Sequence, residues 1–265
     1  MGKLSNYAEN KVLDHVLMND AYPRPDALFI ALATAQVIDA DTGGSISEVS
    51  GGDYARISAD SWDAAANRAV TNSTVMSFPS PSADWGVAFG WAILDTATLL
   101  TGNIVAYGDF SPAKKILSGV AVNIDKGQLD VSYNKAGSSN YLANAVLDHL
   151  FPDTPFTQPA SIYMGFATGS IADTDTGSTV GEPSAGYART LENDWDASDD
   201  GESSNADEFK SKSATADWGD ILYWLQANAL TTGNILFYGE FVSAVSVDSG
   251  YYLKLAANTL TITLD

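Results

Sequence analysis

The residues best suited to binding a ligand are aromatic and arginine side chains that occur twice with the same spacing. Tyr54-Ala55-Arg56 returns as Tyr187-Ala188-Arg189, and Trp62 and Trp195 follow at matching distances. Tyrosine and tryptophan offer large amphipathic faces, and a guanidinium offers several donors, so an exposed patch of this kind could bind a glycan. The candidate ligand or interface residues are therefore Tyr54, Arg56, Trp62, Tyr187, Arg189 and Trp195.

A structural role for the same residues is the alternative, and we favour it. Each Tyr-Ala-Arg directly follows a stretch rich in Gly, Ser, Thr and Asp, over residues 41–53 and 173–186, which predicts a long exposed loop. Where such a loop rejoins a sheet, the rings would pack against the sheet and the arginine would pair with a carboxylate.

His15 and His149 are the only histidines, and each follows Leu-Asp near the end of an expected helix. An imidazole at that position can bond the last helical carbonyls and complement the helix dipole. The chain has no Gly-x-Ser-x-Gly, His-Glu-x-x-His or phosphate-binding glycine loop. We therefore predict no enzymatic activity, no catalytic residues and no cofactor.

An acidic run in the second half of the chain has the alternating carboxylates of a calcium loop. Its members are Asp194, Asp196, Asp199, Asp200 and Glu202. The twelfth loop position, where calcium loops carry a bidentate acid, would be Asn205. The first half offers only Asp60 and Asp63 in the corresponding region, so we favour a solvated loop and predict no metal site.

These residues recur because the chain is a tandem duplication. The stretch from Leu4 to His15 returns from Ser139 to His149, and Thr101-Gly102-Asn103 returns as Thr232-Gly233-Asn234. A repeat this long predicts two domains and no solenoid. We place a first β-sandwich repeat at 1–134 and a second at 135–265, joined by only a short linker.

Each repeat begins with a short amphipathic helix and continues with strands. Ser5 or Asn6 can cap the first helix, and the residues 27–34 and 161–168 predict buried central strands. Near the end of each copy, apolar residues alternate with polar ones, which indicates a strand with one buried face. The fold class expected is mainly β, with two tandem antiparallel β-sandwich (jelly-roll-like) domains, each with one short N-terminal α-helix.

Composition narrows the partners. The net charge is -20, which argues against a nucleic-acid partner, because such binding depends on basic residues that neutralise phosphates. Residues 1–134 carry 15 acids and 8 bases, a net charge of -7, and residues 135–265 carry 18 and 5, a net charge of -13. No stretch is apolar enough to span a bilayer and no signal sequence is recognisable, so we expect no membrane association. Cysteine is absent, which excludes disulfides.

Several motifs together resemble a known family. They are the opening Leu4-Ser5-Asn6-Tyr7, Gly51-Gly52-Asp53-Tyr54-Ala55-Arg56, Asp84-Trp85-Gly86, Thr101-Gly102-Asn103-Ile104 and Gly127-Gln128-Leu129-Asp130-Val131. In order and spacing the first copy resembles small tailed-bacteriophage virion proteins, which are labelled tail fibre proteins or capsid decoration proteins. Family members resemble one copy, whereas this chain has two, and the second departs from the pattern at Trp224-Leu225-Gln226-Ala227.

The resemblance implies a structural protein on the exterior of a phage virion, made in the host cytoplasm. It would act by protein-protein assembly, as a head decoration or cement protein or as a short tail appendage, with major capsid or tail proteins as partners. We expect a homo-oligomer, and a trimer would present six quasi-equivalent domains with pseudo-six-fold symmetry. The alternative is a carbohydrate-binding host-attachment module of the tail fibre, with the candidate tyrosines and tryptophans as stacking platforms.

Overall fold

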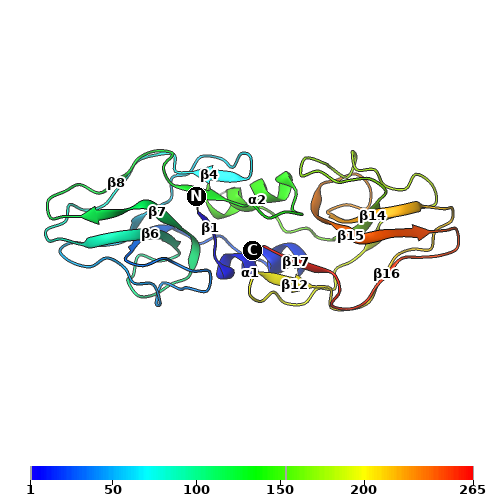
Figure 1. Ribbon diagram of the computed structural model, residues 1–265, viewed down its shortest axis with the longest axis horizontal. Coiled ribbons are helices and arrows are strands. Elements are labelled where there is room, and N and C mark those ends of the chain that lie inside the picture. Colours follow the sequence, from blue (N-terminus) through cyan, green and yellow to red (C-terminus); the bar gives the residue numbers. More distant parts are fainter. Residues whose placement is uncertain (1, 153, 265) are drawn as a thin grey trace. The chain divides into compact units, whose positions relative to one another are not determined.

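The computed structural model describes residues 2–152 and 154–264; residues 1 and 265, which bound the two predicted repeats, lie outside the described residues. The chain is mainly β, with antiparallel strand ladders and two helices, α1 (Asn6–Leu17) and α2 (Asn140–Leu150) (Figure 1). The predicted fold class is confirmed: each copy contributes one short N-terminal helix and a set of antiparallel sheets.

The strands of the two copies match one to one, apart from β1. The first copy has β1 (Lys3–Leu4), β2 (Phe29–Ala33), β3 (Ile57–Ser58), β4 (Ala69–Thr71), β5 (Met76–Ser77), β6 (Gly86–Leu94), β7 (Ile104–Ile116), β8 (Asn123–Ile124) and β9 (Asp130–Ser132). The second copy has β10 (Tyr163–Ala167), β11 (Thr190–Leu191), β12 (Glu202–Ser204), β13 (Phe209–Lys210), β14 (Gly219–Ala227), β15 (Ile235–Val247), β16 (Lys254–Leu255) and β17 (Thr261–Thr263).

One main sheet organises each copy. Its strand order is β1-β7-β6-β2-β3 in the first copy and β11-β10-β14-β15 in the second. Two-stranded sheets accompany each of them: β4-β9 and β5-β8, then β12-β17 and β13-β16. The registers agree as well, since Leu32 lies opposite Trp91 and Phe166 lies opposite Trp224. The predicted central strands are β2 and β10, and four of the five residues in each are buried.

A serine directly before each helix caps its N-terminus. The Ser5 hydroxyl accepts a hydrogen bond from the Ala8 amide, and the Ser139 hydroxyl accepts one from Leu142. These are N-caps, which satisfy amides that have no partner within the helix. Both hydroxyls also donate to a backbone carbonyl, of Ile104 and of Ile235, so each cap fastens its helix to the first residue of β7 or β15. No helix among the described residues is long and apolar enough to cross a membrane.

The chain forms two compact units, and each of them draws on both copies. Unit 1 consists of residues 1–10, 23–134 and 144–156, and unit 2 consists of residues 11–22, 135–143 and 157–265. The C-terminal part of each helix therefore belongs to the unit built mainly from the other copy. Whether each repeat, 1–134 or 135–265, folds as a domain by itself stays a prediction.

Matching contacts hold the helix ends in place. In unit 1, the Asp148 carboxylate accepts a hydrogen bond from the Ala65 amide at 2.6 Å. In unit 2, the Asp14 carboxylate accepts one from the Ser198 amide at 2.9 Å and a second from the Ser198 hydroxyl. Phe151 also packs on Trp62, with ring centroids 4.7 Å apart.

Candidate functional site

Arg56 lies at the centre of a cluster that joins two loops of unit 1, residues 43–48 and residues 96–101. We call this cluster of an arginine, its glutamate and the loop carbonyls a clasp. The Arg56 guanidinium Nη2 lies 2.7 Å from Glu48 Oε1, and neither side chain is appreciably exposed. Nη1 donates to three backbone carbonyls, those of Thr96, Thr98 and Thr101, at 2.8–3.0 Å. With Nε also bonded to Glu48, every nitrogen of the guanidinium is engaged within the chain.

The second copy repeats this clasp. Arg189 pairs with Glu182 at 2.9 Å, and Nη1 donates to the carbonyls of Ala229 and Thr232. Gly43 and Gly177 hold corresponding places in the two clasps. A Cβ on either would lie 1.9 Å from a backbone carbonyl oxygen, of Thr101 or of Thr232, so only glycine fits there.

Tyr54 and Tyr187 complete the clasps. Tyr54 donates to Glu48 at 2.7 Å and accepts from the Leu32 amide at 3.1 Å. Tyr187 likewise donates to Glu182 at 2.8 Å and accepts from the Phe166 amide. Burial, and then the neighbouring carboxylate, raise the pKa of both phenols. The two tyrosines therefore connect the central strand to the loop that the arginine fixes.

The two tryptophans are also enclosed. Trp62 is 7% exposed and Trp195 is 5% exposed. The Trp62 indole donates to the Ala59 carbonyl at 2.5 Å and packs on Phe151. Stacking on a sugar requires an open ring face, which neither residue offers in this structure.

The structure thus brings each predicted Tyr and Arg together in one cluster and places each Trp elsewhere. Among the six candidates, Tyr54 lines a surface hollow of about 260 Å³, together with Leu99 and Leu100. A ligand role for the six residues stays a prediction. The contacts observed are those of the structural alternative, in which the rings pack and the arginines pair with carboxylates.

The histidines organise the chain that leaves each helix. The Tyr22 amide donates to His15 Nδ1 at 3.1 Å, and the Phe156 amide donates to His149 Nδ1 at 3.2 Å. In both copies the donor is thus the amide seven residues further on. The predicted bond from the imidazole to the last helical carbonyls stays a prediction. His15 Nδ1 also lies 3.0 Å from the Asp20 carbonyl oxygen, so this ring contacts two backbone groups of the segment that follows the helix.

The acidic run lies beside β12. Asp196, Asp199, Asp200 and Glu202 line a hollow of about 380 Å³. Across residues 2–152 and 154–264, no group of three or more His, Asp or Glu side chains is arranged to hold a metal ion. The solvated loop favoured from the sequence stays a prediction for these carboxylates.

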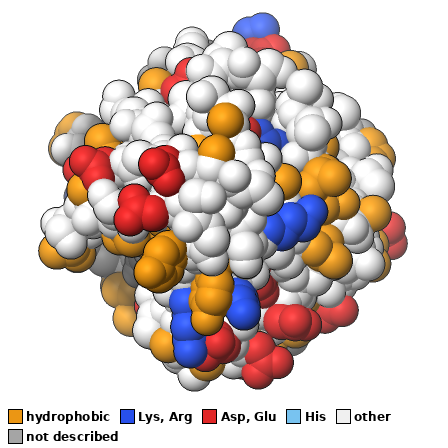
Figure 2. All heavy atoms as spheres, turned by 90° about the vertical axis from the view of Figure 1, so that its right-hand side faces the viewer, with side chains coloured by type: hydrophobic (Ala, Val, Ile, Leu, Met, Phe, Trp, Pro, Cys, Tyr) orange, Lys and Arg blue, Asp and Glu red, His pale blue; other side chains and the backbone are white. Residues whose placement is uncertain are grey.

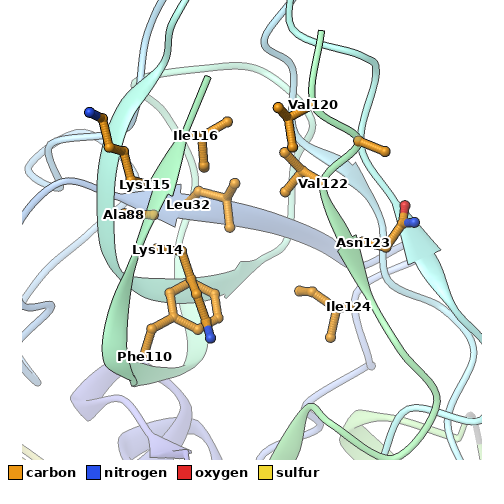
Figure 3. A pocket seen from close by; sticks show the side chains of 11 residues that line it. Leu32, Ala88, Phe110, Lys114, Lys115, Ile116, Val120, Val122, Asn123 and Ile124 are labelled. Carbon is orange, nitrogen blue, oxygen red and sulfur yellow. The ribbon is translucent and has the colours of Figure 1, made fainter. Parts of the chain in front are cut away.

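A second kind of site is a hollow beside β7, which we call the β7 hollow (Figure 3). It has a volume of about 190 Å³, and its apolar wall includes Leu32, Ala88, Ile116 and Val122. Figure 3 shows Leu32, Ile116 and Val122 directed toward one another, with the Lys114 amine beside the Phe110 ring. The Lys115 amine points away from the hollow. The pattern is a small apolar recess with the Lys114 amine at its mouth.

Comparison with known families supplies the identity of the chain. The family model described as Podophage GP4 fiber I protein gp80 matches residues 3–132 and again residues 137–263. The chain belongs to this family. The two matches confirm the tandem duplication and the expected phage virion family. No curated protein matches the chain.

Family membership makes this a phage fibre protein, a structural component of the virion. The sequence reasoning missed Glu48 and Glu182, the acids that pair with the arginines. A signal existed, because they are the glutamates that recur at matching places in the two loops. It also missed the β7 hollow, which depends on residues from β2, β6, β7 and the segment before β8. No local pattern joins residues that far apart in the chain.

Proposed function

We propose that this fibre protein is a short tail-appendage subunit of a podophage, and that it works by assembling with itself and with other virion proteins. The observation that carries the proposal is the match of both copies to a podophage fibre family. The sequence has neither a collagen-like repeat nor a long heptad region, so a self-contained shaft is not its role.

The surface supports assembly over catalysis. On the face of the second unit that Figure 2 shows, apolar side chains lie exposed in several groups beside basic and acidic ones. Exposed apolar residues of that copy include Val242, Tyr251 and Tyr252. Contiguous apolar groups rimmed by charge are typical of surfaces that bind other proteins.

The carbohydrate-binding alternative receives less support. Its proposed platforms, Trp62 and Trp195, are almost fully buried, and Arg56 and Arg189 have their donors engaged within the clasps. A glycan at these residues would require both clasps to open.

Immunogold electron microscopy of purified particles tests the location. Antibody raised against the recombinant chain should label the tail. Label spread over the head shell would instead establish a decoration protein, and unlabelled particles, with antibody shown to bind the free chain, would count against an exposed virion role. A parallel glycan-array screen with the wild type should give no signal.

A further inference from the structure

The β7 hollow lies where the first copy carries smaller side chains than the second. Leu32 corresponds to Phe166 and Ala88 to Ile221, as the matching registers of the main sheets show. In the second copy the Phe166 ring lies 6.1 Å from Phe209 and 6.3 Å from Trp218. The second copy thus packs aromatic rings at this position, whereas the first copy leaves a hollow at the matching position.

The mouth of the hollow carries a cation that the second copy lacks. Lys114 lies opposite Ala88, and the corresponding pair in the second copy is Val245 opposite Ile221. Within residues 2–152 and 154–264, the Lys114 amine has neither an ion pair nor a hydrogen-bond partner. In a chain of net charge -20, an unpaired lysine above an apolar recess favours an occupant that pairs an apolar group with a carboxylate.

The second copy presents such a group at the corresponding bulge. Between the pairs Ile221 with Val245 and Tyr223 with Glu240, the four residues 241–244 of β15 face a single residue of β14 and bulge from the ladder. Val242 in this bulge is 108% exposed, the largest value among the exposed large hydrophobic residues described. Its counterpart in the first copy is Ser111, which lies in the matching bulge of β7. Glu240 precedes Val242 by two residues and is exposed.

We propose that the β15 bulge of one chain, with Val242 as its anchor, inserts into the β7 hollow of another molecule of the same chain. There Glu240 of the first molecule pairs with Lys114 of the other. The proposal rests on the assembly function proposed above and names its interface. The knob, Val242 in the β15 bulge, belongs to the second copy of the duplication, and the hole, the β7 hollow, belongs to the first. A single chain therefore carries both halves of the contact.

Size and charge select this occupant. Small-molecule sites usually measure about 300–1,000 Å³, whereas the β7 hollow has about 190 Å³. That volume suits one or two side chains, and buried anchors of this kind dominate binding energy at protein interfaces. Because every chain is strongly acidic, two molecules associate most easily where one of them offers a lysine and an apolar recess.

The geometry has a consequence for symmetry. A contact between two different surfaces of the same chain is heterologous, and such contacts build rings when the rotation closes and filaments when it does not. A closed ring of three chains would alternate first and second units and present six of them. This is the assembly that the duplication suggested.

The first test measures the mass of the full-length protein by sedimentation velocity with two exchange variants. Ala88→Ile fills the hole with the residue of the second copy, and Val242→Ser replaces the knob with the residue of the first. We expect a wild-type oligomer that both variants convert to monomer. Val75→Ser, which removes another exposed apolar side chain, is the matched control and should leave the oligomer intact.

A wild type that is monomeric at its highest soluble concentration would overturn the proposal, as would an oligomer that survives both Ala88→Ile and Val242→Ser. Unchanged circular dichroism and melting would show that the variants are folded. Val242→Ser is a surface change, so it reports on assembly even where Ala88→Ile perturbs packing.

Charge exchange supplies the second test. Lys114→Glu and Glu240→Lys should each weaken association at least about tenfold in Kd, and the double variant should recover most of that loss, as a cycle of coupled charges does. Additive losses would overturn the pairing. The result is independent of where the protein sits on the virion. Immunogold label on the tail together with a monomeric chain would overturn this interface and the self-assembly, and would leave the proposed tail location and the assembly with other virion proteins standing.

Discussion

The two copies agree at their clasps and differ at their hollows. Both retain an Arg-Glu-Tyr cluster. Two carbonyls that accept from the arginine Nη1 also correspond, those of Thr98 and Thr101 with those of Ala229 and Thr232. Beside β7, however, Leu32 and Ala88 leave a recess, while Phe166 and Ile221 fill the matching place beside β15. Contacts shared by the two copies therefore indicate what the fold requires, and unshared ones indicate where the two copies differ in the surface they present.

The largest expected effect tests the shared part. Arg56→Met and Arg189→Met each remove the partner of a glutamate whose side chain is 6% exposed in Glu48 and 19% exposed in Glu182. An enclosed charge without its partner costs up to about 3–5 kcal/mol. We expect both variants to lose free energy of unfolding in that range, as measured by urea denaturation followed by tryptophan fluorescence. Lys126→Met is the control, because Lys126 and Asp63 form an exposed pair, 3.7 Å apart, whose loss should cost less than about 1 kcal/mol.

Comparable losses in the arginine variants and in Lys126→Met would show that the clasps contribute little. A large loss in one copy alone would show that the resemblance between the clasps is geometric and not energetic.

Exchange of the residues that separate the copies should give unequal effects. Phe166→Leu removes ring contacts from a filled core and should cost about 1–3 kcal/mol. Leu32→Phe adds its ring to an open hollow and should cost less than about 1.5 kcal/mol. The measurement is urea denaturation of both full-length variants. Equal losses would contradict the view that one site is full and the other is open.

A titratable group also distinguishes the copies. Burial, and then the nearby carboxylates of Asp194 and Asp207, raise the pKa of Glu192 from 4.5 to about 7. The corresponding residue in the first copy is Ala59, whose amide makes the same backbone bond. The folded chain then binds more protons at Glu192 than the unfolded chain between pH 4.5 and about 7, so this group's contribution to stability falls as the pH rises through that window.

Glu192→Ala should therefore remove part of the pH dependence, by no more than about 1.4 kcal/mol per pH unit for one proton. The variant should gain stability over the wild type near pH 8 and gain less near pH 5, in urea titrations at both values. Asp194→Ala is an informative companion, because loss of that charge should lower the pKa of Glu192. Parallel stability curves for wild type and Glu192→Ala would refute the assignment.

The smallest expected effect concerns a surface pair. Lys254 pairs with Glu208, and Asn123 occupies the corresponding place in the first copy. Both side chains are about half exposed, so solvent screens their attraction. Lys254→Asn should leave the melting temperature within the scatter of replicate scans. A clear drop would show that this pair is coupled to the packing of Tyr252, over whose ring the neighbouring Lys210 lies.

Much of the architecture was predictable because duplication repeats its own signals. The caps at Ser5 and Ser139, the buried strands β2 and β10, and the alternation that buries Leu129 and Val131 all follow from local patterns. Local patterns could not show that Asp148 accepts a hydrogen bond from Ala65. Apolar residues at helical spacing indicate that one face of a helix is buried, but they do not indicate which segment covers that face.

The candidate site was predictable in its residues and less so in its role. The repeated Tyr and Arg were found from spacing, but their burial depends on Glu48 and on carbonyls some 40 residues away, such as those of Thr96 and Thr101. The β7 hollow could not be predicted, since a recess is the difference between side-chain volumes on separate strands. The difference in side-chain volume becomes apparent only when the structure places Leu32 and Phe166 at matching positions of the two main sheets.

The exchanged helix ends set a timetable for biosynthesis. Unit 1 is completed by residues 144–156, so Trp62 has no ring from Phe151 to cover it until the ribosome has begun the second copy. Unit 2 in turn uses residues 11–22, which emerge early and must wait for the chain that contains Ser198. Nascent chains usually finish their N-terminal domain first, whereas here unit 1 must wait for the first residues of the second copy, and unit 2 needs residues from both copies.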